Sequence, residues 1–422
     1  MTAIDLKPLP MEEAVQYWRN KVLLSPGQFA RLSNEAKLHA FAVSGIAKGD
    51  ELATVYQALQ SAIAKGTTYA DFQRDIAAVI ERRGWTGVRA WRVENIFRTN
   101  IQTAYSVGRY KQMRETANRR PYWRYSAVND SRTRPTHLAL HGKVFPADHP
   151  FWDTWYPPNG YNCRCGVDSL SQFYIDKRGI EVETDDPTGK LIEPIDPETG
   201  GKMPARLLMP DPGFALNPGK AYWGGIVDAA DRPGKWDALP GLKTAGDYRR
   251  PALANVRPGD ITDLDETALL PEGKGDDFYR EAFLARYGDE KIVKDVLGEP
   301  VILSLRSFLV DKTPGAAAVW KFDKAGHGAS IPLMEAIVLE PYEIWLTPQR
   351  NEAGRIRLSK RYVGLWKTED KQRIGGLAVY EVVDGMLLGV THFTPLKGRS
   401  GKPDLDYLEM QRMGLLLYGK GR

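Results

Sequence analysis

The chain has 422 residues, of which 42% are hydrophobic and 26% are charged, with a formal net charge of +5 and two cysteines. This composition excludes a chain that is disordered throughout, and the length allows two or three globular domains. Two cysteines do not make a disulfide framework, and no apolar run is long enough for a membrane-spanning helix.

Residues 1–90 are expected to form a helical N-terminal module. From residue 11 onwards, apolar residues recur at helical spacing. Ser25 followed by Pro26 is typical of a helix start, and Gly66 and Gly84 are expected to end two further helices. The first residues lack the apolar stretch of a signal peptide, so we expect synthesis in a cytosol.

Residues 91–186 are expected to form a small α+β domain. The pattern predicts a long helix from about residue 87 to 118, a strand over 122–128 and an aromatic loop over 149–162. The segment 91–134 contains ten Lys or Arg against three Asp or Glu. Such a segment can face a phosphate backbone, or it can be the solvated face of a helix.

A polar motif lies within this domain. Its members are, in chain order, Asp130, Arg132, Arg134, His137, Gly142, Pro158, Asn162, Cys163 and Cys165. In a strand, the two cysteines would share one face, about 6 to 7 Å apart. Cys163 and Cys165 can bind zinc with partners among His137, His141 and His149, or they can form a hydrogen-bonded structural cluster with Asp130 and His137. The paired cysteines favour a structural role over catalysis by Cys163.

The motif resembles that of the phage head morphogenesis family, which comprises Mu F-like and SPP1-type minor head proteins. The order D-x-R-x-R-x-x-H, a glycine, and then P-P-x-G-x-N-C-R-C carries the resemblance over residues 90 to 170. The resemblance implies a virion protein that is located in the phage head near the portal vertex and acts in head assembly and DNA delivery. It implies the portal protein, packaged DNA and other head proteins as partners, no membrane, and a period in the host cytoplasm during assembly.

Residues 187–275 are rich in proline and glycine and show little periodicity. We interpret them as an extended connector that lies along a neighbouring protein, because long structureless loops are rare inside compact domains. A weakly patterned globular insert is the alternative.

Residues 276–422 are expected to form a separate α+β domain. Short helices precede four alternating segments, which predict an antiparallel meander, and Asp384-Gly385 is typical of a hairpin turn. The whole chain is therefore expected to be a multidomain α+β protein.

This element order resembles the barnase, EndoU, colicin E5/D and RelE group of metal-independent ribonucleases, in the version that is found on phage head proteins. The resemblance implies that His327 acts as a base, Arg361 as a phosphate clamp, Thr394 as a hydrogen-bond donor to phosphate and His392 as an alternative acid. No cofactor is required for this chemistry.

Three functional interpretations remain open for the C-terminal domain. It can be a toxin-type ribonuclease that acts on host RNA and uses the head domain only for packaging, or an inactive fold that binds nucleic acid or a virion partner. An ADP-ribosyltransferase is less favoured, because its Arg, Ser-Thr-Ser and Glu-x-Glu order is missing. Host toxicity that depends on His327 or Arg361 would distinguish an enzyme from a structural protein.

Overall fold

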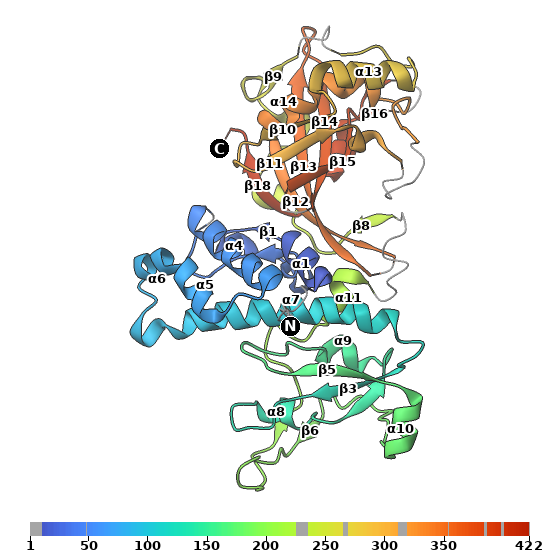
Figure 1. Ribbon diagram of the computed structural model, residues 1–422. Helices are drawn as coiled ribbons and strands as arrows, with labels where there is room; N and C mark the ends of the chain where they lie inside the picture. Colours follow the sequence, from blue (N-terminus) through green and yellow to red (C-terminus); the bar gives the residue numbers. More distant parts are fainter. Residues whose placement is uncertain are drawn as a thin grey trace, which may run out of the picture. The chain divides into compact units, whose positions relative to one another are not determined.

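The computed structural model describes residues 11–47, 49–224, 235–264, 269–310, 319–352, 354–383, 386–397 and 401–421. The chain divides into two units. Unit 1 is formed by Met1–Arg232 with Ala353–Ile356, and unit 2 by Pro233–Glu352 with Arg357–Arg422. Both units combine helices and sheets, which confirms the multidomain α+β class (Figure 1).

Unit 1 is built around the 25-residue helix α7, Trp91–Glu115. In Figure 1, the N-terminal helices lie on one side of α7 and a small sheet lies on the other. The remaining helices and short strands of the N-terminal part are α1 (Glu12–Arg19), β1 (Val22–Leu23), α2 (Pro26–Ala30), α3 (Asn34–Lys37), β2 (Ala40–Phe41), α4 (Asp50–Lys65), α5 (Tyr69–Asp75) and α6 (Ala77–Arg83).

The predicted helix boundaries of this part are confirmed. The Ser25 side chain accepts the backbone N–H of Gln28, whose own side chain accepts from Ser25, so a capping box starts α2. Gly66 and Gly84 end α4 and α6 with φ values of +67° and +60°, which glycine adopts without strain.

The small sheet of unit 1 has β3 at its centre, paired antiparallel with β4 and β5. Its elements and flanking helices are β3 (Tyr122–Ser126), α8 (Pro135–Leu138), β4 (Val144–Pro146), α9 (Phe151–Trp155), β5 (Gly166–Leu170) and α10 (Gln172–Arg178). The loop expected over 149–162 was wrong in part, because it contains α9. Phe151, Trp152 and Trp155 are buried, so burial of three aromatic side chains stabilises this helix.

One hydrophobic core runs through unit 1, from Ala14 in α1 to Trp223. The expected modules 1–90 and 91–186 share this core. Tyr110 of α7 contacts Trp123 of β3 with ring centroids 5.8 Å apart, while α1 and α4 pack on α7 from the other side. The N-terminal helices and the sheet are therefore packed as one folding unit.

The stretch 187–275, expected as one connector, is divided between the two units. Its first part adds β6 (Leu191–Ile192), β7 (Arg206–Leu207) and α11 (Pro218–Trp223) to unit 1. There, Trp223 donates its indole N–H to the carbonyl of Val107, with a distance of 2.9 Å. The second part adds β8 (Trp236–Ala238), three 3-10 turns (Gly246–Tyr248, Leu253–Asn255, Pro258–Asp260) and β9 (Thr262–Asp263) to unit 2.

Unit 2 contains a nine-stranded sheet with the order β10-β11-β15-β14-β13-β12-β18, to which β8 and β9 are added. The strands β12 to β15 are neighbours in chain order, which confirms the predicted meander; β13, β14 and β15 pair antiparallel. The Asp384-Gly385 turn lies outside the described residues.

The helices and strands of unit 2 from residue 276 onwards are, in chain order, α13 (Asp276–Tyr287), β10 (Glu290–Lys294), β11 (Pro300–Ser304), two 3-10 helices (Leu305–Phe308, Gly328–Leu333), α14 (Met334–Leu339), β12 (Glu343–Asn351), β13 (Ile356–Lys367), β14 (Arg373–Val383), β15 (Met386–Phe393), the two-stranded sheet of β16 (Leu396–Lys397) and β17 (Lys402–Pro403), α15 (Leu405–Met410) and β18 (Leu415–Gly419).

Both faces of this sheet are covered. On one face, Tyr362, Ala378 and Tyr380 pack with α13 and α14. On the other face, the core residues of β12, β13 and β14 pack with α15 and with residues 245–261, which we call the strap. The strap contributes Leu253 and Val256, both almost completely buried. Successive residues of a strand point to opposite faces of the sheet, so they belong alternately to the two hydrophobic cores.

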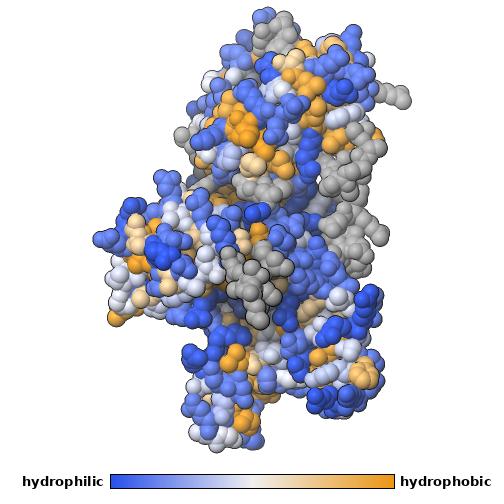
Figure 2. Space-filling view, viewed as in Figure 1, coloured by the Kyte–Doolittle hydropathy of each residue, from blue (hydrophilic) through white to orange (hydrophobic). Residues whose placement is uncertain are grey.

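The surface of the molecule is mixed. Hydrophilic residues cover most of the face drawn in Figure 2, and apolar residues form small separate patches between them. Within the described ranges, no helix has the length and apolar character needed to cross a bilayer.

Candidate functional site

The polar motif of unit 1 brings His137, Cys163 and Cys165 together. The His137 Nδ1 atom lies 3.8 Å from the Cys163 sulfur and 3.6 Å from the Cys165 sulfur. All three residues are buried, and the two cysteines are free thiols. This cluster can act as a metal-binding set or as a hydrogen-bonded thiol–imidazole group.

Local chain geometry presents both cysteines to the same histidine. They lie just before β5, and not inside a strand as expected, because β5 begins at Gly166. Asn162 precedes them with φ of +55°, a left-handed conformation that asparagine tolerates. His137 sits in α8, a single turn that begins with proline.

Arg164, between the two cysteines, points to the other side and forms an ion pair with Asp130. Its Nη1 atom donates to Asp130 Oδ2 over 2.8 Å, and its Nη2 atom donates to Oδ1 and to Thr133. Arg164 holds the pKa of the Asp130 carboxyl well below its usual range. This bidentate pair ties the loop that precedes α8 to the segment that carries the cysteines. We call the ion pair and the thiol–imidazole cluster together the clasp.

The two thiols differ in acidity. The pKa of Cys163 is lowered, first by a hydrogen bond from Cys165 and then by His137, against the effect of burial. The pKa of Cys165 is raised by the same hydrogen bond and by burial. Cys163 is therefore the more acidic of the two thiols, and Cys165 is the hydrogen-bond donor to it.

Other predicted members of the motif lie apart from this cluster. His141 is turned away, because its Nδ1 atom accepts the backbone N–H of Ala127 over 3.1 Å. Arg132 is exposed, and its Nη2 atom lies 3.4 Å from Asp130 Oδ2. Pro158 and Asn162 line a cleft on the outside of the motif.

This cleft has a volume of about 810 Å³ and lies between α7, the β1–β2 region and the motif. The cations Lys37, Arg92 and Arg134 line it, and no Asp or Glu does. Lys21 also lines it, but this side chain is buried, and burial lowers its pKa to about 7. Arg134 is paired with Asp211, whereas Lys21 donates to the hydroxyl of Tyr17 and the carbonyl of Leu38. Sequence reasoning missed this cleft, because its lining comes from five separate parts of the chain, at 17–44, 91–103, 134, 158–162 and 212–218.

The basic segment 91–134 is partly neutralised by acids from elsewhere in unit 1. Arg109 and Arg124 both contact Asp168, at 3.4 and 3.1 Å. Arg98 is paired with Glu94 on the same helix. Asp168 therefore offsets part of the positive charge of the segment, whereas Glu94 is one of the three acids of the segment itself.

In unit 2, the predicted catalytic residues are divided between the two faces of the sheet. Ala378 pairs with both Tyr362 and His392, and Val379 pairs with both Arg361 and Thr391. Because neighbouring residues of a strand point to opposite faces, His392 and Arg361 lie on different sides. The structure does not bring these two together.

His392 lies on the face covered by α14. Its Nε2 atom donates to the Ser330 carbonyl over 2.9 Å, and burial lowers its pKa to about 4. Lys360 and Tyr362 point to the same face, opposite to Arg361, and both bind Asp295 Oδ2, over 2.7 and 2.6 Å.

Arg361 is buried on the strap face. Its Nη1 atom donates to the Gln411 carbonyl over 3.3 Å, and its Nε atom has no hydrogen-bond partner. Within the described ranges, no ion pair joins it to a carboxylate. Burial lowers the pKa of Arg361 to about 10. A buried cation of this kind is suited to bind an anion.

His327 and Thr394 lie where β15 ends. The His327 ring stacks on Phe393 with centroids 4.7 Å apart, and Phe393 contacts Tyr407 at 5.8 Å. The His327 Nδ1 atom donates to the Lys324 carbonyl over 3.2 Å, which leaves the lone pair on Nε2. Burial lowers the pKa of His327 to about 4. The Thr394 hydroxyl is buried without a partner.

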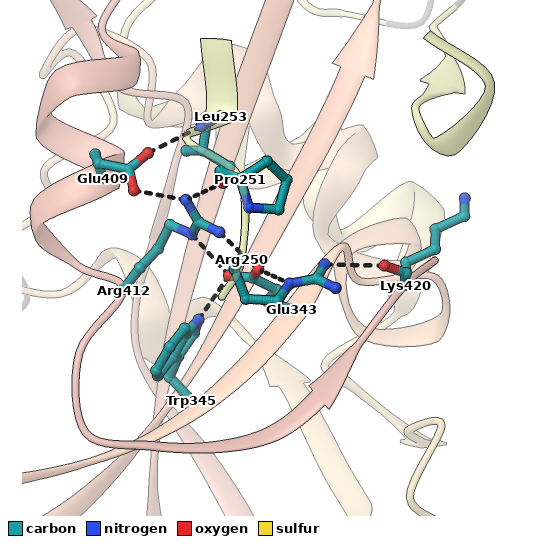
Figure 3. Close-up of polar contacts among 8 residues, drawn as sticks. All are labelled: Arg250, Pro251, Leu253, Glu343, Trp345, Glu409, Arg412 and Lys420. Carbon is teal, nitrogen blue, oxygen red and sulfur yellow. Dashed lines mark hydrogen bonds and ion pairs between the residues drawn. The ribbon is translucent and has the colours of Figure 1, made fainter. Parts of the chain in front are cut away.

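A buried charge network also anchors the strap, and it was not predicted (Figure 3). Arg412 donates to both carboxylate oxygens of Glu343, each over 2.7 Å, and Arg250 adds a contact of 2.7 Å. Arg412 also donates to the Pro251 carbonyl, while Glu409 accepts the backbone N–H of Leu253. Glu343 directly precedes the apolar run Ile344–Leu346 of β12, which is the sequence signal for its burial.

Comparisons with known proteins agree with this division. Residues 53–168 match the family model described as Phage Mu protein F like protein, and residues 277–419 match the model described as phage-Barnase-EndoU-ColicinE5/D-RelE like nuclease2. No solved structure matches the chain.

Two curated relatives match over part of their length. The "Putative capsid assembly protein F" of Escherichia phage Mu is 34% identical over 247 residues, which cover 51% of this chain and 56% of the relative. The Mu-like prophage FluMu F protein of Haemophilus influenzae is 39% identical over 183 residues, which cover 40% of this chain and 44% of the relative. The chain thus spans about half the length of these relatives. It carries a Phage Mu protein F like region in unit 1 and a phage-Barnase-EndoU-ColicinE5/D-RelE like nuclease2 region in unit 2.

Proposed function

We propose that this chain is a minor head protein of a tailed phage, which acts in head assembly near the portal vertex and in DNA delivery. The clasp is the observation that carries the proposal. Asp130, Arg164, His137 and the two cysteines belong to the head morphogenesis motif, and they form a half-buried ion pair next to a buried thiol–imidazole cluster within the Mu F-like region. The motif therefore joins the loop before α8 to the segment that carries the two cysteines.

The cleft beside the clasp supports a docking role for unit 1. Its cations Lys37, Arg92 and Arg134 and its lack of carboxylates suit an acidic segment, and complementary charge mainly increases the rate and the specificity of association. We assign this cleft to the portal protein. Packaged DNA and other head proteins are the remaining proposed partners.

The test uses the phage or prophage whose genome encodes the chain. Lys37→Glu reverses a charge in the cleft without touching the clasp, and Lys65→Glu is the matched control on the exposed end of α4. We expect the first variant to be reduced in purified heads, measured by quantitative mass spectrometry, and the control to be retained. Absence of the wild-type chain from purified heads would refute the head-protein assignment, and equal incorporation of both variants would refute the docking role of the cleft.

A second function is proposed for unit 2, namely metal-independent RNA cleavage. It is favoured by the buried Arg361 guanidinium, which has no carboxylate partner in the described part of the chain and shares the strap face with Phe393, against which His327 stacks. The His327 Nε2 atom would take the proton of a ribose 2′-hydroxyl, whose oxygen attacks the phosphorus while the 5′-oxygen leaves and is protonated by water. Arg361 would hold the phosphate oxygens.

His392 is not part of this proposal, because it lies on the opposite face. Host RNA is the proposed substrate of a toxin-type effector that is packaged through the head region. Both proposed groups are buried, so RNA would reach them only after a local movement of the segments that cover them.

The experiment measures cleavage of a labelled RNA mixture by the purified full chain in EDTA. We expect Arg361→Gln to lower the rate at least a hundredfold, and Arg350→Gln, an exposed arginine on β12, to leave it unchanged. Equal rates for wild type and Arg361→Gln would remove Arg361 from the mechanism, and lack of cleavage by the wild type would leave unit 2 as a binding domain.

A further inference from the structure

Unit 1 contains three metal-binding side chains that converge in its interior. The donor atoms of His137, Cys163 and Cys165 all lie within 4.8 Å of one another. Each side chain is at most 6% exposed. Among the described residues, no other His, Cys, Asp or Glu group of this kind is found. The donors are one imidazole nitrogen and two sulfurs, the set that zinc accepts and that calcium and magnesium do not.

The distances between these donors fit the edges of a tetrahedron around zinc. With Zn–S of about 2.3 Å and Zn–N of about 2.0 to 2.1 Å, a regular tetrahedron has S–N edges of about 3.6 Å. The two measured distances from Nδ1 to the sulfurs are 3.6 and 3.8 Å. The chain therefore needs only small side-chain shifts to close around the ion.

We propose that His137 Nδ1 and the sulfurs of Cys163 and Cys165 bind a structural zinc ion. Binding replaces the thiol protons with the metal and leaves both sulfurs as thiolates. His141 lies outside the ligand set, because the converging donors do not include it and its Nδ1 atom accepts the backbone N–H of Ala127.

The buried Tyr125 lies next to this cluster. Its hydroxyl interacts with Cys165 and donates to the buried Asn159 side chain over 2.9 Å. This oxygen either completes the tetrahedron or hydrogen-bonds a water that does so. The three ligand side chains are buried, which is typical of a structural site and not of a catalytic one.

Surrounding groups hold the ligands in place. The Asp130–Arg164 ion pair lies on the other side of the same segment, and Gln102 of α7 donates to the Cys165 carbonyl over 2.8 Å. Trp155 packs edge-on against the His137 ring, with centroids 5.9 Å apart. The three donors therefore come together through contacts that do not themselves need the metal.

The experiment measures the zinc content of the purified full chain by mass spectrometry after exposure to Zn²⁺ under reducing conditions. We expect one zinc per chain for the wild type, and an affinity at least a hundredfold lower for Cys165→Ser and for His137→Gln. His141→Gln is the matched control and should keep one zinc per chain with unchanged affinity.

Cobalt substitution tests the site without any variant. Co²⁺ bound to two thiolates in a tetrahedral site gives sulfur-to-cobalt charge-transfer bands and strong visible absorption. These bands in the wild type would support the proposal even if the cysteine variants fail to fold. Absence of both zinc and cobalt binding in the folded wild type would overturn it, and so would preferential occupation by copper(I) or a Cys163–Cys165 disulfide in protein purified under reducing conditions.

Discussion

Arg412 and Glu343 form a bidentate ion pair whose two side chains are completely buried, with both N–O distances at 2.7 Å. Arg250 contacts the same carboxylate, and the Trp345 indole donates to it over 2.8 Å. These contacts join the strap, the first residue of β12 and the segment before β18, which are distant in sequence (Figure 3). The pair therefore connects the two ends of unit 2.

Arg412→Ala is expected to destabilise unit 2 by about 3 to 5 kcal/mol, because it leaves the Glu343 carboxylate buried with one partner fewer. Lys397→Ala, in a solvent-exposed pair with Asp406, should change stability by less than about 1 kcal/mol. Thermal and urea unfolding of the full chain measure both effects. Equal stabilities of the two variants would contradict the structural role of the network.

The strap sets the boundary at which unit 2 can be isolated. A fragment from residue 235 keeps the strap, whereas a fragment from residue 276 exposes the sheet face on which Leu253, Val256 and Ile261 pack. Burying each of these side chains contributes about 1.5 to 3 kcal/mol. We expect the longer fragment to unfold cooperatively and the shorter one to aggregate or bind a hydrophobic dye. A shorter fragment that is equally stable would show that the strap is dispensable.

Acid is expected to weaken unit 2 through two buried histidines. Burial lowers the pKa of His327 and His392 from 6.5 to about 4, so the unfolded chain binds more protons between these values. Their contribution to stability is complete above about pH 6.5 and is lost as the pH falls towards 4. Each contributes on the order of 3 kcal/mol at neutral pH. His392→Gln should flatten the dependence of the unfolding free energy on pH in this window, and an unchanged slope would exclude His392 as its source.

The clasp predicts a second effect on the proposed zinc site. Arg164→Met removes the ion pair that fixes the segment between the cysteines, and it is expected to lower zinc affinity about tenfold without removing a ligand. Arg132→Met affects the same carboxylate from an exposed position, with its side chain 80% exposed, and should change the affinity less than about twofold. Competition titration with a zinc chelator measures both. Equal affinities for both variants would mean that Asp130 does not position the site.

Much of the local structure could be predicted from sequence. Helix starts and ends at Ser25, Gly66 and Gly84, and the order of the strands in the C-terminal meander, follow from capping residues and from period-2 alternation. The helix α9 was missed, because three of its five residues are large aromatic side chains that resemble a loop pattern and become helical only through burial. The division of the 187–275 stretch was missed because its short elements are stabilised by contacts with distant residues.

The candidate sites show the same contrast between what is predictable from sequence and what is not. The sequence alone determined that Asp130, His137, Cys163 and Cys165 belong to one ordered motif, and that Lys360 and Tyr362 oppose Arg361, because strand alternation is a local property of the backbone. Only the tertiary structure decided that His141 lies outside the cysteine cluster and that His392 and Arg361 lie on opposite faces of the sheet. It also decided that Glu343 pairs with two arginines. Such pairings depend on which segments meet across the folded chain, and no local pattern of residues encodes that meeting.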